Sequence, residues 1–149
     1  MNVGELCNRE VIIVGQDATV LEAAKLMRQY HVGDLVVIEK RQGASFPIGI
    51  LTDRDIVIEI IAAEVDFDAV TVGDVMSYEL ITASEEDAIA DTIKLMRDKG
   101  IRRVPVVNKQ GELEGIIAVD DLIDLLAEQM QDIVALISCE KKREQRKCV

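Results

Sequence analysis

The stretch Lys25-Leu26-Met27-Arg28 recurs unchanged as Lys94-Leu95-Met96-Arg97, which marks this chain as an internal repeat. On the same shift of 69 positions, residues 3–38 as a whole align with residues 72–107. Repeats of this length are typically supersecondary units that bury their apolar faces against each other. Two such units related by a pseudo-twofold axis leave a cleft between them, and clefts are where ligands bind.

The order of elements is the same in both repeats, because residues 49–56 fall on residues 115–122 after a loop that is three residues shorter in the second copy. Apolar, often β-branched runs indicate strands, and Thr19 followed by Glu22 has the capping-box spacing that begins a helix. In the first copy we predict strands at 11–14, 35–38 and 48–51, with helices after Thr19 and from about Asp53 to Ala63. In the second copy we predict strands at 80–82, 104–107 and 113–117, with helices at 87–99 and about 120–137. The fold class is therefore α/β, with two β-α-β-β-α repeats packed sheet to sheet about a pseudo-twofold axis.

The chain is expected to divide into three segments. The first repeat covers residues 1–69, the second covers 70–127, and a C-terminal helix extension with a basic tail covers 128–149. The run at 140–147 is mixed but mostly basic. It fits either a solvated, fraying helix end or a helix that extends a dimer or binds a partner.

Composition excludes several classes of partner. The chain has 149 residues, 49% of them hydrophobic, and a formal charge of −11, which opposes contact with nucleic acid or an anionic membrane face. It has two Tyr, two Phe and no Trp, too few aromatics for a base-stacking platform. No apolar run approaches the roughly 20 residues that cross a bilayer, and no secretory leader is visible. Cys7, Cys139 and Cys148 lack metal or redox spacing, so we expect a cytoplasmic chain with reduced thiols.

No catalytic constellation is visible in the sequence. The single histidine, His31, follows Tyr30 at a predicted helix end and has no Ser or Cys neighbour with which to form a nucleophile–base pair. Acidic clusters such as Asp53/Asp55 and Asp120/Asp121 could bind a hard cation, but their positions at helix starts already explain them as caps. We therefore expect no enzyme activity, no metal and no required cofactor.

The strongest indication of a site lies where a buried strand runs into a helix, at residues 49–55. Free N–H groups at a helix start favour phosphate, Thr52 supplies a hydroxyl, and Asp55 is placed to accept hydrogen bonds from a vicinal diol such as ribose. A second indication is the pair Arg102-Arg103 at the start of a buried strand, because guanidinium groups fit phosphate oxygens bidentately. Each motif alone has a simpler explanation, a helix cap for the first and an exposed basic pair for the second.

Taken together in the repeat frame, these motifs resemble the tandem cystathionine-β-synthase (CBS) domain pair, or Bateman module, over residues 3 to about 127. The residues that carry the resemblance are those at 49–55, 74–76, 102–106 and 115–121. The resemblance implies an inter-repeat cleft that binds adenosine-containing ligands such as AMP, ADP, ATP, NAD or S-adenosylmethionine. It also implies a homodimer formed through helices, for which Ile56, Ile60, Ile61 and the stretch Leu122 to Met130 are the expected surfaces.

The resemblance divides the ligand-binding residues between two sites. At the first, Thr52 and Asp55 would hold ribose, and Arg102 and Arg103 would hold phosphate. The other residues expected there are Ile50, Arg54, Leu80, Ile81 and Pro105, with Ile50, Ile81 and Pro105 as walls around adenine. At the second site, Asp121 would be joined by Ala118 in place of Thr52 and by Gly33 and Asp34 in place of the two arginines. Because Asp34 repels phosphate, this site is expected to be empty or to take an uncharged nucleoside.

Three functional classes compete on this basis. The favoured one is a stand-alone regulatory module that senses an AMP-, ADP-, ATP- or NAD-type ligand and signals to an unknown protein target. An alternative is an interaction protein whose repeats only build a dimer. The third, an enzyme such as a nucleotide hydrolase, lacks any nucleophile–base pair in this sequence.

Overall fold

The computed structural model describes residues 1–147, with Lys147 described by its backbone alone. The chain divides into two compact units, Met1–Ile117 and a second that begins at Ala118. In chain order the elements are α1 (Val3–Leu6), β1 (Ile13–Gly15), α2 (Val20–Tyr30), β2 (Asp34–Arg41), β3 (Ala44–Thr52), α3 (Asp53–Ile56), the π-helix η1 (Val57–Ile61), α4 (Val72–Val75), β4 (Ala83–Ser84), α5 (Ile89–Lys99), β5 (Arg103–Val107), β6 (Leu113–Ala118) and α6 (Val119–Lys147).

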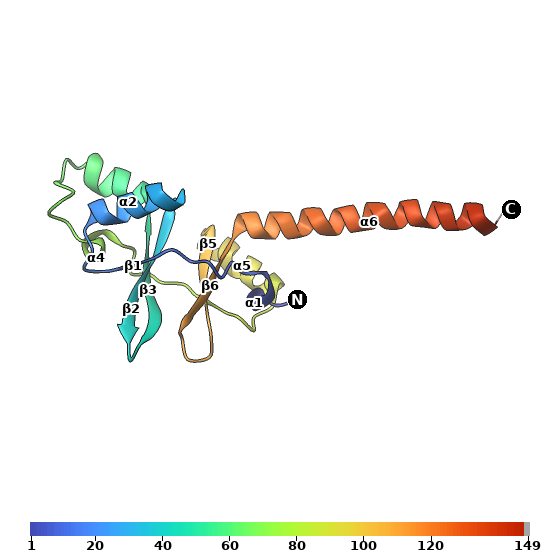
Figure 1. Cartoon of the computed structure of the whole chain (residues 1–149), viewed down its shortest axis with the longest axis horizontal. Coiled ribbons are helices and arrows are strands. Elements are labelled where there is room, and N and C mark those ends of the chain that lie inside the picture. The colour runs from blue at the N-terminus through green and yellow to red at the C-terminus, as the bar shows by residue number, and fades with distance from the viewer. Residues whose placement is uncertain (148–149) are drawn as a thin grey trace. The chain divides into compact units, whose positions relative to one another are not determined.

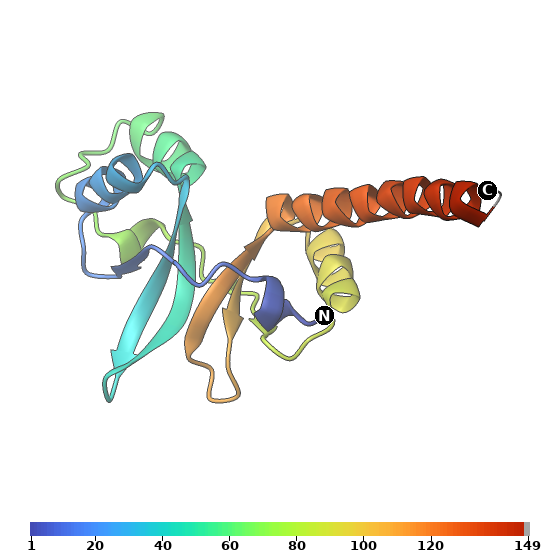
Figure 2. The same cartoon turned by 45° about the vertical axis from the view of Figure 1, so that its right-hand side comes forward.

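The α/β fold is confirmed as two three-stranded sheets with the same strand order. In the first sheet, β1 runs parallel to β2, and β2 pairs antiparallel with β3. The second sheet has the order β4-β5-β6, with β4 parallel to β5. Figures 1 and 2 both show the long strands of the two sheets lying side by side, with α2 and α3 beside the first sheet.

Local chemistry explains where helix α2 begins and which face it buries. The Thr19 hydroxyl accepts a hydrogen bond from the Glu22 N–H at 3.1 Å, and the Glu22 carboxylate accepts one from the Thr19 N–H at 3.1 Å. This is the capping box that the sequence predicts. Helical spacing then buries Val20, Ala23 and Met27. The helix ends at His31, which takes the left-handed conformation, so the histidine is a C-cap.

The leading segment of each repeat packs on the other repeat. The N–H groups of Val3 and Gly4 donate to the carbonyls of Asp87 and Glu85, at 2.9 and 2.8 Å. The equivalent N–H groups of Val72 and Gly73 donate to Ala18 and Gln16, also at 2.8 and 2.9 Å. The side chains of these segments also pack on the other repeat. The core cluster of the first sheet includes Val72 and Met76, which belong to the second repeat. Each half of the core is thus completed by the other repeat.

Glycine makes this exchange of segments possible. Ser77 donates its N–H to the Ile50 carbonyl at 3.0 Å, which brings residues 76–77 against β3. A Cβ atom on Gly49 would lie 2.7 Å from the Ser77 carbonyl oxygen, and one on Gly115 would lie 2.7 Å from the Asn8 carbonyl oxygen. Glycine is therefore required at both equivalent positions, because any side chain would push the crossing segment away.

Several predicted boundaries are wrong. The first strand of each repeat begins later than expected, at Ile13 and Ala83, because pairing starts only where the chain meets Val36 of β2 and Val106 of β5. The predicted helix from Asp53 to Ala63 becomes α3 followed by the π-helix η1, and α6 continues past Ile137 to Lys147. The short helices α1 and α4 were not predicted. In the expected dimer surface, Ile60 is buried in the core, whereas Ile61 is exposed.

Candidate functional site

The candidate site is a cavity of about 410 Å³ within the first unit. Four pieces of chain line it: the starting residue of β2, the end of β3 with the first turn of α3, the segment 77–81, and the segment 100–103 that leads into β5. Its walls therefore come from both repeats, as expected for a cleft at a pseudo-twofold axis. Its volume is in the range of small-molecule sites.

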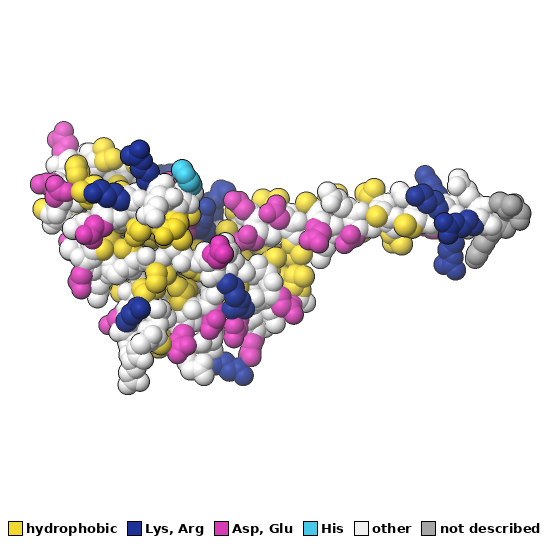
Figure 3. Space-filling model, in the orientation of Figure 1, with side chains coloured by type: hydrophobic (Ala, Val, Ile, Leu, Met, Phe, Trp, Pro, Cys, Tyr) yellow, Lys and Arg dark blue, Asp and Glu magenta, His cyan; other side chains and the backbone are white. Residues whose placement is uncertain are grey.

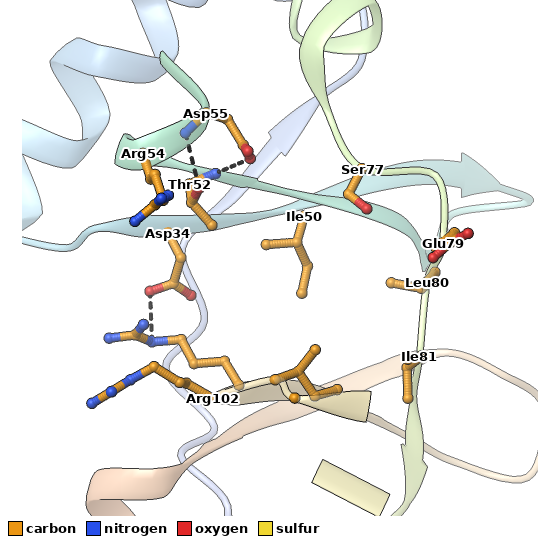
Figure 4. A pocket seen from close by; sticks show the side chains of 13 residues that line it. Asp34, Ile50, Thr52, Arg54, Asp55, Ser77, Glu79, Leu80, Ile81 and Arg102 are labelled. Atoms are coloured by element: carbon orange, nitrogen blue, oxygen red, sulfur yellow. Dashed lines mark hydrogen bonds and ion pairs between the residues drawn. The ribbon is translucent and has the colours of Figure 1, made fainter. Parts of the chain in front are cut away.

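Thr52 and Asp55 form the polar end of this cavity. Strand β3 ends at Thr52 and α3 begins at the next residue, so both side chains are fixed by a capping box. The Asp55 N–H donates to Thr52 Oγ1 at 3.1 Å, and the Thr52 N–H donates to Asp55 Oδ2 at 3.0 Å (Figure 4). Within residues 1–147, Asp55 Oδ1 accepts no hydrogen bond, so one carboxylate oxygen of a rigidly held side chain remains able to accept from a ligand hydroxyl.

Three apolar side chains form the walls. Ile50, Leu80 and Ile81 line the cavity and are each only partly buried, and Figure 4 shows them pointing into the space between the two sheets. Leu80 and Ile81 can do so because the strand expected at 80–82 begins only at Ala83. Pro105 differs from the expectation: it is fully buried inside β5 and does not line this cavity.

Not every arginine of the cavity is available to a ligand, because one of them already forms an ion pair. Arg54 and Arg102 are exposed, line the cavity and form no ion pair with any residue in the described part of the chain. Arg103 differs, because its Nε lies 2.9 Å from Oδ1 of Asp34, a carboxylate whose side chain is only 12% exposed. One of the two arginines expected to hold phosphate is therefore already paired.

Asp34 corrects the expected division of residues between two sites. We expected it at the second site, yet it lines this cavity beside Arg103. Positions 34 and 103 are equivalent in the two repeats, and residues that start equivalent strands near a pseudo-twofold axis meet each other. Burial raises the pKa of the Asp34 carboxyl above its ordinary value, the Arg103 guanidinium opposes this rise, and the carboxylate of Asp53 adds to it.

Sequence reasoning also missed part of the lining. Ser77 and Glu79 line the cavity although no motif marks them. They follow α4, whose packing on the first repeat carries this segment past β3, and only the long-range pairing of Ser77 with Ile50 reveals that path.

Asp121 lies in the second unit, where its Oδ2 accepts a hydrogen bond from the Ala118 N–H at 2.8 Å. It thus caps the start of α6, as Asp55 caps α3. Ala118 provides no hydroxyl there. Within residues 1–147, no group of three or more His, Cys, Asp or Glu side chains is arranged to hold a metal ion. No helix in that range is both long and apolar enough to pass through a bilayer.

Comparison with known proteins identifies relatives of the whole repeat pair. A sequence model of the CBS domain matches residues 3–62 and 72–128. A Methanopyrus kandleri protein is 37% identical over 84% of this chain, which spans 62% of that relative's length. The CBS domain-containing protein YhcV of Bacillus subtilis is 38% identical over 81% of this chain and 82% of its own length.

Among solved structures, a CBS domain pair in complex with 5′-methylthioadenosine and S-adenosyl-L-methionine has a TM-score of 0.74 to this chain. The match covers 87% of this chain and 98% of that one, at 22% identity. At this identity, the likeness shows a shared fold.

Proposed function

This chain belongs to the CBS domain family, and we propose that it is a regulatory module that binds an adenosine-containing ligand in the cavity at Thr52 and Asp55. One observation carries the proposal. A rigid carboxylate, three partly buried apolar side chains and two guanidinium groups converge on one cavity built from both repeats. Among the described residues, one oxygen of the carboxylate and both guanidinium groups have no partner. A nucleoside would contact the carboxylate and the apolar side chains, and a phosphate would contact the guanidinium groups.

Each part of such a ligand has a partner of matching chemistry. Adenine is flat and apolar on its faces, and it fits against Ile50, Leu80 and Ile81, which lose exposed apolar surface when covered. The ribose diol donates to Asp55 Oδ1, a charge-assisted hydrogen bond. Arg54 and Arg102 are available to a phosphate or carboxylate, since neither is engaged by another described side chain.

The family relationship supports the same ligand class. The related CBS domain pair described above was solved with two adenosyl compounds. The ligands we propose to test are therefore AMP, ADP, ATP, NAD, S-adenosylmethionine and adenosine. A ligand-dependent change in the cleft is then transmitted to a protein target. The rival proposal, an interaction protein without a ligand, predicts that none of these compounds binds.

The test is the melting temperature with and without each compound, because a ligand that binds only the folded state must raise it. Asp55→Asn should reduce the rise, because it removes the charge of the carboxylate that accepts from the ligand. The matched control is Asp74→Asn, because Asp74 forms an equivalent capping box with Thr71 but does not line the cavity. If both variants lose ligand binding equally, the effect comes from a lost helix cap and the proposed site is wrong.

We further propose that two chains pair through α6, antiparallel to each other. Its apolar side chains recur at alternating spacings of three and four residues and are each at least half exposed, as expected for one side of a coiled coil. They are Ile123, Leu126, Met130, Ile133 and Ile137. A second copy of the same stripe is a partner of matching shape and chemistry.

The charges along α6 favour the antiparallel orientation. Residues 119–133 carry five carboxylates and no cation, whereas the cations are gathered at 141–147 (Figure 3). Antiparallel pairing centred on Met130 places Lys141 and Lys142 of one helix beside residues 118–119 of the other, next to the acidic first turn at Asp120 and Asp121. Parallel pairing would place like charges together.

Cysteine cross-linking distinguishes the two orientations. In a background with Cys139→Ser and Cys148→Ser, a mixture of Ile123→Cys and Ile137→Cys chains should form the mixed disulfide in preference to either self-disulfide. Self-disulfides of each variant alone would show parallel pairing. Light scattering that reports a monomer at micromolar concentration would exclude both.

A further inference from the structure

The cavity proposed to bind an adenosyl ligand contains as many carboxylates as guanidinium groups. Arg54, Arg102 and Arg103 are matched by Asp34, Asp55 and Glu79. A site built for several phosphates needs an excess of cations, because phosphate binding is dominated by charge. This lining provides no excess.

Asp34 is the carboxylate whose burial makes its repulsion of a bound anion strong. Its side chain is only 12% exposed, whereas its partner Arg103 is 41% exposed, so Asp34 is less screened by water than the cation it pairs. A half-buried charge acts over several ångströms at an effective dielectric constant far below that of water. Any phosphate that reaches Arg103 must therefore approach Asp34.

Asp53 adds to the negative field at this point. Its N–H donates to the Gly33 carbonyl at 2.9 Å, which brings the start of α3 against the residue that precedes Asp34. A Cβ atom on Gly33 would lie 3.0 Å from Asp53 Oδ2, so the Asp53 carboxylate lies against this backbone. The carboxylate of Asp53 thus acts on Asp34 from just outside the lining of the cavity.

We propose that Asp34 is a specificity-determining residue that makes this cavity select adenosyl ligands of low negative charge over nucleoside di- and triphosphates. The inference rests on the proposed function, because it concerns the ligand class of the same site. Adenosine, cationic adenosyl compounds and AMP are accepted. Each further phosphate adds repulsion from Asp34, and Arg103 does not offset it because this arginine is already paired with Asp34.

Calorimetry with adenosine, AMP, ADP and ATP on the wild-type chain and on Asp34→Asn tests this directly. The amide keeps the shape of the side chain and removes its charge. We expect wild-type affinity to fall from AMP to ATP. In Asp34→Asn, affinity for ATP should rise about tenfold, affinity for AMP less and affinity for adenosine hardly at all. Raising the salt concentration should shrink the gain for ATP.

Two further variants separate this effect from general ones. Glu10→Gln removes one negative charge at an exposed residue whose side chain makes no contact with the cavity, and it should leave the ligand order unchanged. Asp53→Asn weakens the field at Asp34 without touching the Asp34–Arg103 pair, and it should give the same order of gains at smaller size. Asp53→Asn also provides the test of the proposal if Asp34→Asn does not fold.

The possible outcomes are distinct. Lower ATP affinity in Asp34→Asn would mean that Asp34 orients Arg103 for phosphate, and the inference would be overturned. Equal gains for all four ligands would overturn it as well, although the proposed function would stand. Absence of binding by every adenosyl ligand to wild type and to both aspartate variants would overturn the inference together with the proposed function.

Discussion

The two strand–helix junctions of this chain are equivalent in sequence but not in chemistry. At the first, Thr52 and Asp55 exchange two hydrogen bonds, at 3.0 and 3.1 Å. At the second, Ala118 and Asp121 form only one, from backbone N–H to carboxylate, at 2.8 Å. The aspartate caps a helix in both places. Because only Thr52 and Asp55 line the cavity of the first unit, only this pair is proposed to bind ligand, and the two junctions provide matched controls for each other.

The largest expected difference between the junctions is in ligand affinity. Asp55→Ala should weaken the adenosyl ligand about ten- to a hundredfold, because it removes a charge-assisted hydrogen bond worth roughly 1.5–3 kcal/mol. Asp121→Ala should leave the affinity nearly unchanged. Titration calorimetry on both variants measures this, and equal losses would show that the two junctions contribute to one function.

Glycine substitutions should affect both junctions alike, since each has a glycine three residues before its cap. Gly49→Ala and Gly115→Ala should each lower the free energy of unfolding by about 1–3 kcal/mol, because the added methyl group would lie 2.7 Å from a carbonyl oxygen of a crossing segment. Urea denaturation gives the values. Gly15→Ala is the control, because a Cβ atom there meets nothing within 4 Å. Tolerance at either site would mean that the crossing segment is held less closely.

Exchanging the capping residues should make the junctions resemble each other. Thr52→Ala removes the hydroxyl that accepts from the Asp55 N–H, and loss of such an N-cap costs about 1 kcal/mol of stability. Ala118→Thr offers the same hydroxyl to the Asp121 N–H and should stabilise by up to about the same amount. Chemical denaturation of both variants checks the pair. A destabilised Ala118→Thr chain would show that the second junction has no space for the hydroxyl.

The smallest expected effect is a pH dependence at Asp34, a residue of the first unit with no acidic counterpart at the equivalent position 103. Because its pKa is raised in the folded state, the folded protein binds this proton more tightly than the unfolded chain does. The resulting stability is present at acid pH and is lost as the pH rises through the raised pKa. Relative to wild type, Asp34→Asn should therefore show its largest gain in the free energy of unfolding at neutral pH. This gain should shrink as the solution is acidified. Unfolding curves at several pH values, with Glu10→Gln as control, measure this; a constant difference would contradict it.

The sequence predicted the features that depend on local pattern. The repeat, the order of strands and helices, and the Thr19–Glu22 cap all follow from spacing within a few residues, and the structure confirms them. The sequence also placed Thr52 and Asp55 together, and both line the cavity of the first unit, because the turn that joins strand to helix is a local feature.

The features that the sequence did not predict depend on contacts between distant residues. Nothing near Asp34 in the sequence indicates that it meets Arg103, 69 positions away. The sequence pattern predicted a strand at Leu80 and Ile81. Strand pairing begins only at Ala83, opposite Val106, so Leu80 and Ile81 are left to line the cavity. Pro105 shows the opposite error, since its position in a recognised motif suggested a wall, whereas β5 buries it completely.

The exchange of leading segments between the repeats bears on how such a chain could arise by duplication. Residues 2–8 complete the sheet of the second repeat, and residues 71–77 complete that of the first. Each repeat carries a leading segment, but that segment covers the core of the other repeat, so a single copy could complete its core only by exchanging segments with a second molecule. Joining two copies in one chain makes this exchange intramolecular and therefore independent of protein concentration.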